Sequence, residues 1–337
     1  MARRLPPIVL PGLPHRARHA GDDYGAPATP NWRETDWQEH LRQVSIDGTT
    51  VNYVDYGSGA EGVPPVVLIH GLGGCWQNWL ENIPAIAASG RRVIALDLPG
   101  FGFSEMPHED ISISGYGRCV NALCDELDLG EVVLAGHSMG GFTACETAIQ
   151  FPERVERIVL ISAAGITTSD QAQQPILAGA RVLAALGTRA ASRSRQVVVR
   201  KRLRRLLYGG FIRYPDLIET DFLFEITQGS GRPGFNPALA AILGYDFRDR
   251  LPDISCPVLI VWGSDDMLVP DSDAGRFERL IPNSRKIVME DTGHSAMMER
   301  PQPVNDLIVE FLAEVHDAAA PEDELGAPAA VRGAQAG

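Results

Sequence analysis

The stretch Gly136-His137-Ser138-Met139-Gly140 decides the fold of this chain. Before it, residues 131–135 are mostly apolar and rich in valine, which is typical of a buried strand. After it, residues 141–150 are rich in alanine and have helical spacing. A strand that becomes a helix within one Gly-x-Ser-x-Gly unit makes a sharp, strained turn, on which side chains at the two glycine positions would collide with the packed strand and helix. We therefore expect the Ser138 hydroxyl to stand clear of the sheet, at the positive end of a helix.

The pattern on both sides of this turn predicts an α/β fold with a mostly parallel central sheet and helices on both faces. Two strands flank the turn signal Asp47-Gly48, at 41–46 and 49–56. Further strands are expected at 66–69, 92–98, 157–162, 257–262 and 285–289, and helices at 77–88, 116–127 and 304–315. The alternation stops at 168–250, where the pattern is helical. We expect a helical cap there, inserted between core segments 32–167 and 251–317, before the strand at 257–262 that leads to Asp265 and Asp266. We also expect a flexible N-terminal arm over 1–31 and a disordered tail over 318–337.

Composition limits the kinds of partner. The 337 residues carry a net charge of −13, so nucleic acid is not expected as a partner. The five cysteines are scattered, with no Cys-x-x-Cys pair, and no apolar run approaches the length of a membrane helix. We therefore expect a cytoplasmic protein. The basic run at 200–205 contrasts with the negative net charge of the chain. A solvated helix face explains this run better than contact with a membrane surface.

Ser138 has suitable partners farther along the chain. A serine hydroxyl is a weak nucleophile and needs a base, and the base needs an acid to fix its tautomer. His294 follows the last expected strand, and Asp265 and Asp266 follow the strand before it. The carboxyl ends of parallel strands meet at one edge of a sheet, where such folds place their sites. The chain order serine, aspartate, histidine also suits this fold.

These motifs resemble those of the α/β-hydrolase fold superfamily, in its group of cap-bearing serine esterases and lipases, over residues 40–315. The matching segments are His70-Gly71-Leu72-Gly73-Gly74 for the oxyanion loop, Gly136 to Gly141 for the nucleophile turn, Trp262 to Asp266 for the acid, and Gly293-His294 for the base. The resemblance implies Ser138, Asp266 and His294 as the catalytic triad and the backbone N–H groups of Leu72 and Met139 as oxyanion donors. It favours Asp266 over Asp265, and it makes His70, Gly71, Gly136 and Gly140 supports of the two loops.

Other residues receive structural interpretations. His137 is expected to pack or to line the pocket rather than to act as the base, and His70 to anchor its loop by hydrogen bonds. Asp97 and Ser104 lie in a Gly/Pro turn and are interpreted as structural. A dinucleotide fingerprint would require glycine where Trp76 stands.

The sequence thus predicts a serine hydrolase that cleaves a carboxylic ester through an acyl-enzyme, with no cofactor or metal. Apolar residues of the cap favour a small-molecule ester with an apolar part; these are Leu206, Phe211, Phe222, Leu223 and Phe224. Serine at position 138 argues against haloalkane dehalogenases and epoxide hydrolases, which attack with a carboxylate. Carbon–carbon bond hydrolases of aromatic ring-cleavage products are nearer, although they typically carry asparagine where His137 stands. A perhydrolase or an acyltransferase could use the same triad, and a non-catalytic binding protein could use the same scaffold.

Overall fold

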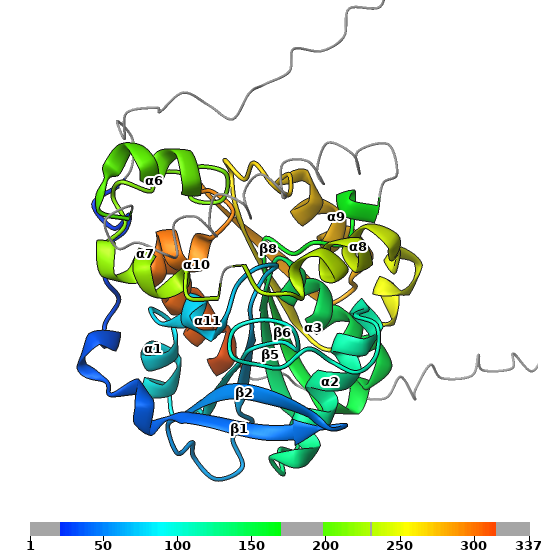
Figure 1. Cartoon of the computed structure of the whole chain (residues 1–337). Coiled ribbons are helices and arrows are strands. Elements are labelled where there is room, and N and C mark those ends of the chain that lie inside the picture. Colours follow the sequence, from blue (N-terminus) through cyan, green and yellow to red (C-terminus); the bar gives the residue numbers. More distant parts are fainter. Residues whose placement is uncertain (1–20, 170–197, 230, 315–337) are drawn as a thin grey trace, which may run out of the picture.

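The computed structural model describes residues 21–169, 198–229 and 231–314. Within these ranges, eight strands form one sheet in the order β1-β2-β4-β3-β5-β6-β7-β8 (Figure 1). The strands are β1 (Leu41–Ile46), β2 (Thr49–Tyr56), β3 (Val66–Ile69), β4 (Val93–Leu96), β5 (Val132–His137), β6 (Val155–Ile161), β7 (Val258–Gly263) and β8 (Ser284–Met289). β2 pairs antiparallel with β1 and with β4, and all other neighbours are parallel. The predicted sheet is confirmed.

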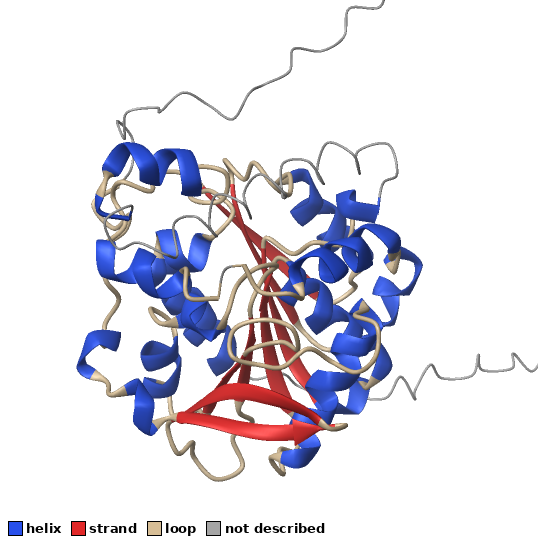
Figure 2. Cartoon of the chain, in the orientation of Figure 1, coloured by secondary structure: helices blue, strands red, loops and turns tan. Residues whose placement is uncertain are grey.

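Helices cover both faces of this sheet (Figure 2). On one side lie α1 (Ile83–Ala88), α10 (Ala296–Glu299) and α11 (Pro301–Ala313), and on the other α2 (Ile113–Glu126), α3 (Met139–Gln150) and α9 (Ser272–Leu280) (Figure 1). Because side chains alternate along a strand, Val66 and Leu68 of β3 pack on the first side, while Val67 and Ile69 pack on the second. Both faces of the central strands are therefore apolar, as a doubly covered parallel sheet requires.

The prediction of one continuous helix over 77–88 is wrong. The chain there forms the short 3-10 helix η3 (Trp76–Trp79) and then α1, which starts at Ile83. Pro84 lies in the first turn of α1, and a proline is tolerated there but breaks a helix interior. Five more 3-10 helices occur in the described residues: η1 (Trp32–Glu34), η2 (Trp37–Glu39), η4 (Pro152–Arg154), η5 (Thr167–Ser169) and η6 (Arg248–Asp253).

Residues 21–31 do not form the loose arm that the sequence predicts. Tyr24 and Ala28 are buried, with exposed fractions of 5% and 2%. The Ala28 N–H donates to the buried Glu81 carboxylate at 2.8 Å, and the Gly25 N–H donates to the Glu299 carbonyl at 2.7 Å. Two isolated apolar side chains and backbone hydrogen bonds leave no periodic pattern, which explains the error. Residues 1–20 and the predicted tail lie outside the described residues.

The inserted segment between β6 and β7 contributes α6 (Lys201–Tyr208), α7 (Thr220–Ile226) and α8 (Phe235–Gly244). α6 and α7 lie on the side of α1 and α10, and α8 lies on the side of α3 and α9 (Figure 1). Residues 170–197 of the predicted cap lie outside the described ranges. Among the helices of the described ranges, none has the length and hydropathy needed to cross a membrane.

Candidate active site

Ser138 occupies the strained turn that the sequence predicts. It lies between the end of β5 and the start of α3, with φ 55° and ψ −114°. The two flanking glycines allow this turn to pack. A Cβ on Gly136 would lie 2.2 Å from the Gly140 carbonyl oxygen, and one on Gly140 would lie 2.1 Å from the Ile69 carbonyl oxygen. Since these obstacles are backbone atoms, no side chain can give way, and both positions require glycine.

The loop after β3 lies directly beside Ser138. A Cβ on Gly71 would lie 3.1 Å from Ser138 Cβ. His70 fixes this loop: its Nδ1 donates to the Gly71 carbonyl at 2.8 Å, and its Nε2 accepts from the Leu98 N–H at 3.0 Å. Complete burial lowers the pKa of His70 to about 4, so the ring is neutral and can both donate and accept. The two hydrogen bonds join the oxyanion loop to the segment that follows β4.

The acid and base candidates are hydrogen-bonded to each other. His294 Nδ1 lies 2.7 Å from Asp266 Oδ2, and both side chains are almost completely buried. The second oxygen, Asp266 Oδ1, accepts from the N–H groups of Leu268 and Val269 at 2.8 and 2.9 Å. A carboxylate held in this way fixes the tautomer of the imidazole, with the proton on Nδ1 and a free electron pair on Nε2.

Asp265 has a different neighbour. Its Oδ1 lies 3.4 Å from Nη2 of Arg213, which belongs to the inserted segment, and its side chain is one-third exposed. Of the two adjacent aspartates, Asp266 is the one that bonds to the His294 imidazole. The geometry therefore agrees with the choice of Asp266 over Asp265.

His137 joins the histidine loop, residues 293–295, to the serine turn, residues 136–140. Its Nε2 lies 3.1 Å from the His294 carbonyl oxygen, and the two ring centroids are 4.8 Å apart. Since a carbonyl only accepts, Nε2 carries the proton. Burial and the neighbouring His294 hold the pKa of His137 well below its usual value. His137 is thus a neutral packed residue that ties the loop carrying His294 to the turn carrying Ser138.

Asp97 and Ser104 are structural, as the sequence predicts. Asp97 accepts from Asn52 Nδ2 at 2.8 Å and from the N–H groups of Trp76 and Phe103 at 2.7 and 2.9 Å. Ser104 Oγ donates to the Asp97 carbonyl at 2.6 Å. Burial raises the pKa of Asp97 to about 6 despite these donors. The pair holds together the loops that follow β3 and β4.

Glu299 is a completely buried carboxylate, five residues after His294, that no sequence motif singles out. Its side chain accepts hydrogen bonds from the backbone on both sides of that histidine, from Gly293 and Ser295. The available signal in the sequence was an acidic residue, Glu299, directly after the apolar residues 296–298.

In the described residues, no cluster of three or more His, Cys, Asp and Glu side chains could hold a metal ion.

The apolar residues of the predicted cap lie in different surroundings. Phe222 and Leu223 belong to the hydrophobic core, whereas Leu206 is 78% exposed, and the apolar part of the substrate stays a prediction. In the basic run, Arg204 is buried and Arg205 pairs with Asp216, with hydrogen bonds of 3.0 and 2.7 Å. Only three cations of that run, those of residues 200–202, are exposed. The preference for a solvated helix face over membrane contact stays a prediction.

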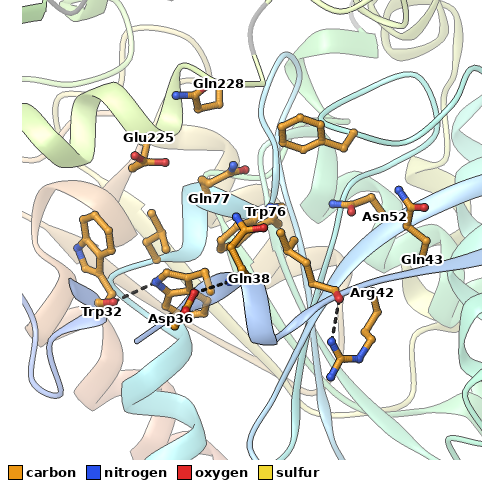
Figure 3. A pocket seen from close by; sticks show the side chains of 14 residues that line it. Trp32, Asp36, Gln38, Arg42, Gln43, Asn52, Trp76, Gln77, Glu225 and Gln228 are labelled. Carbon is orange, nitrogen blue, oxygen red and sulfur yellow. Dashed lines mark hydrogen bonds between the residues drawn. The ribbon is translucent and has the colours of Figure 1, made fainter. Parts of the chain in front are cut away.

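An open groove of about 990 Å³ is lined by fourteen residues, among them Trp76 and Gln77, which follow the oxyanion loop in the sequence (Figure 3). Its walls come from η1, η2, β1, β2, η3 and α7, and Ser138, Asp266 and His294 do not line it. Trp37 and Trp76 pack there with ring centroids 5.4 Å apart, and Trp37 Nε1 donates to the Trp32 carbonyl at 3.0 Å. The segment before β1 is thus part of the body's surface.

A family model of the alpha/beta hydrolase fold matches residues 64–301. The chain belongs to the alpha/beta hydrolase fold family. The matched range of this alpha/beta hydrolase includes the serine turn, the oxyanion loop, both aspartates and His294. The resemblance seen in the sequence is therefore confirmed at the level of family and fold.

Curated relatives of this alpha/beta hydrolase differ in their named activities. The chain is 35% identical over 273 residues to the dihydrolipoyllysine-residue acetyltransferase component of an acetoin cleaving system from Pseudomonas putida, covering 80% of this chain and 69% of that one. It is 32% identical over 276 residues to a 2-hydroxy-6-oxononadienedioate/2-hydroxy-6-oxononatrienedioate hydrolase from Cupriavidus pinatubonensis, covering 79% and 92%.

The chain is also similar to a hydrolase of known structure. A meta-cleavage product hydrolase from Pseudomonas fluorescens IP01 superposes with a TM-score of 0.63 at 26% identity, covering 81% of this alpha/beta hydrolase and 98% of that chain. The likeness to these two named hydrolases therefore extends over nearly their whole length in both comparisons.

Proposed function

We propose that this protein is a serine hydrolase with Ser138 as nucleophile, His294 as general base and Asp266 as the residue that orients it. The observation that carries this proposal is the 2.7 Å hydrogen bond between His294 Nδ1 and Asp266 Oδ2, on a loop that His137 joins to the strained strand–helix turn carrying Ser138. In such an arrangement Nε2 takes the serine proton, and the serine oxygen attacks a carbonyl carbon. The N–H groups of Leu72 and Met139 serve as the oxyanion donors; that of Met139 opens α3 and so has no acceptor within the helix.

We further propose that the bond cleaved is a carbon–carbon bond next to a ketone. The relatives named as 2-hydroxy-6-oxo-dienedioate hydrolases support this choice, because the chain covers more than nine-tenths of one of them. Such a reaction adds water across the bond: the carbonyl carbon becomes a carboxylate, and its former neighbour leaves with the electron pair. The leaving carbon needs a proton, and protonated His294 can supply it, as it would for a leaving alcohol.

Hydrolysis of a carboxylic ester is the second candidate. His137 supports it, because it stands where carbon–carbon bond hydrolases typically carry asparagine. Both reactions need the same nucleophile, base and oxyanion donors. They differ only in the atom that leaves.

The test is a direct comparison of the two substrate classes. Purified protein is assayed with a 2-hydroxy-6-oxo-dienedioate, whose conjugated chromophore disappears on cleavage, and with p-nitrophenyl esters of graded chain length. We expect a higher kcat/KM for the dienedioate and no activity of Ser138→Ala on either class. Preference for the esters would favour the second candidate. Inactivity of the native protein on both, together with failure to react with phosphonates, would indicate a binding protein on this scaffold.

A further inference from the structure

The buried Glu299 carboxylate contacts both backbone neighbours of His294. Its Oε2 accepts from the Gly293 N–H at 2.8 Å, and its Oε1 accepts from the Ser295 N–H at 3.0 Å. The chain also closes on itself here, because the Glu299 N–H donates to the Ser295 carbonyl at 2.9 Å. The single turn of α10 thus brings Glu299 back under the loop that carries the histidine.

The close fit depends on glycine at position 293. A Cβ there would lie 2.9 Å from Glu299 Oε1 and 2.9 Å from the Arg213 nitrogen. The histidine loop is therefore packed between the carboxylate and the inserted segment, with little room to move. Any displacement of Glu299 is transmitted to the backbone on both sides of His294.

Two segments that are distant in the sequence donate hydrogen bonds to the Glu299 carboxylate. The Arg213 N–H, from the inserted segment, donates to Glu299 Oε2 at 3.0 Å, and the Tyr24 hydroxyl donates to the same oxygen. Tyr24 in turn accepts from the Tyr214 N–H at 2.9 Å, and the two tyrosine rings are 5.2 Å apart in an edge-to-face arrangement. The N-terminal segment, the inserted segment and the histidine loop therefore meet at one side chain.

The four hydrogen-bond donors around Glu299 explain why position 299 carries a carboxylate. An ionised carboxylate only accepts, so it can receive all four donors, whereas an amide would turn an N–H₂ group towards one of them. Burial raises the pKa of Glu299, and the hydrogen bonds from Tyr24 and the three backbone N–H groups oppose that rise. An isolated buried charge would be strongly unfavourable, so the donors are what allow it.

We propose that Glu299 is a positioning residue, which holds the backbone of residues 293–295 so that the His294 imidazole stays bonded to Asp266 and close to Ser138. This inference rests on the proposed function of His294 as general base. Displacement of a reacting group by about 1 Å can cost about 100-fold in rate. The role of Glu299 should therefore appear in kcat more than in KM.

Glu81 provides a matched control. It is also a buried carboxylate, with its pKa raised by burial, and it anchors the same N-terminal segment. It accepts from the Ala28 N–H at 2.8 Å and from Trp32 Nε1 at 2.8 Å, both of which lie far from residues 293–295 in the sequence. Glu81→Gln thus introduces the same chemical change at a carboxylate whose donors belong to the N-terminal segment instead of the histidine loop.

The experiment compares Glu299→Gln, Glu299→Asp and Glu81→Gln in the full chain. The first readout is the deshielded proton resonance of His294 Nδ1–H, assigned by its loss in His294→Gln. The second is kcat and KM on a substrate that the native protein cleaves. We expect Glu299→Gln to shift or broaden the resonance and to lower kcat about 10- to 100-fold, with KM within about threefold. Glu299→Asp keeps the charge but retracts the carboxylate, so its effect should be intermediate. Glu81→Gln should lower only the melting temperature.

The outcomes separate this inference from the proposed function. If Glu299→Gln does not fold, Glu299→Asp alone decides, since a resonance and kcat equal to those of the native protein would overturn the inference. The same result in Glu299→Gln would also overturn it. If the native protein cleaves neither substrate class, the proposed function fails. The resonance then still shows whether Glu299 positions the imidazole.

Discussion

His294 Nδ1 and Asp266 Oδ2 lie 2.7 Å apart, and the other oxygen of Asp266 is fixed by two backbone N–H groups. The turn after β7 therefore orients the carboxylate, and the carboxylate orients the imidazole. Both side chains are buried, so the hydrogen bond between them does not compete with water. The base is thus prepared before any substrate arrives.

Asp266→Asn should lower kcat about 10⁴-fold, by analogy with other serine triads, whereas Asp265→Asn should change it less than about threefold. Asparagine at 266 can still accept from Leu268 and Val269, but its N–H₂ group then faces His294 Nδ1. The imidazole must move its proton to Nε2 and can no longer accept the serine proton. Steady-state kinetics of the two variants provide the measurement. Equal losses, or the reverse order, would mean that Asp265 is the acid.

Ser138→Ala should abolish both hydrolysis and labelling by a fluorophosphonate. The native protein should gain the mass of one adduct, and peptide mapping should locate it at residue 138, because Ser138 lies on the strained turn beside the histidine loop. The variant should keep its melting temperature, since alanine and serine tolerate a positive φ about equally badly. Adduct formation that persists in the variant would assign the nucleophile elsewhere.

Gly140→Ala should destabilise the fold by about 3 kcal/mol through overpacking. The added Cβ would lie 2.1 Å from the Ile69 carbonyl oxygen and 2.7 Å from that of His70, so β3 and α3 must separate. Gly130→Ala is the control, because no heavy atom lies within 4 Å of a Cβ placed there, and it should change stability by less than about 0.5 kcal/mol. Denaturant unfolding measures both. Similar stabilities for the two variants would contradict the packing described for the serine turn.

Local patterns predicted most of the sheet and the triad candidates. The strands at 41–46, 49–56 and 66–69 have the predicted bounds, because their alternation or continuous apolar character is bounded by glycine or proline turns. Ser138, Asp266 and His294 could be proposed because each lies just beyond a strand, and the parallel sheet gathers such positions at one edge. In these cases the local sequence and the overall fold favour the same structure.

The contacts that the sequence did not reveal are long-range and polar. Glu299 and Tyr24 are 275 residues apart, and neither lies in a periodic pattern. Arg204 belongs to a run of charges, yet it is buried because carbonyl groups of neighbouring segments accept its hydrogen bonds. Such pairings depend on how distant segments pack, and a single sequence contains no local signal for them.

Asp97→Asn should make stability fall more steeply as the pH drops from 6 to 4. Burial raises the folded-state pKa of Asp97 to about 6 from its ordinary value of 3.8, so the folded protein binds this proton more tightly than the unfolded chain. Protonation of Asp97 therefore increases the free energy of unfolding as the pH falls. His70 has the opposite effect, because its lowered pKa of about 4 decreases the free energy of unfolding over nearly the same interval.

Without Asp97, one of the buried carboxyls whose raised pKa opposes the His70 contribution is absent. The slope of unfolding free energy against pH should then increase by up to about 1.4 kcal/mol per pH unit between pH 4 and 6. Urea unfolding of both proteins across this range gives the slopes. Parallel slopes would show that Asp97 is already ionised in the folded protein throughout the interval.

Arg204→Gln should destabilise the protein by about 3 kcal/mol, while Arg202→Gln should change stability by less than about 0.5 kcal/mol. The Arg204 guanidinium is buried and donates to the carbonyls of Val198 and Ile218 and to the Thr220 hydroxyl. Its loss leaves buried acceptors without a partner, and glutamine is too short to reach all three. Arg202, two residues earlier on α6, is exposed. Chemical denaturation of the two variants distinguishes a structural arginine from a solvated one. Equal and small effects would mean that the basic run is a free surface, and anionic vesicles would then be its next test.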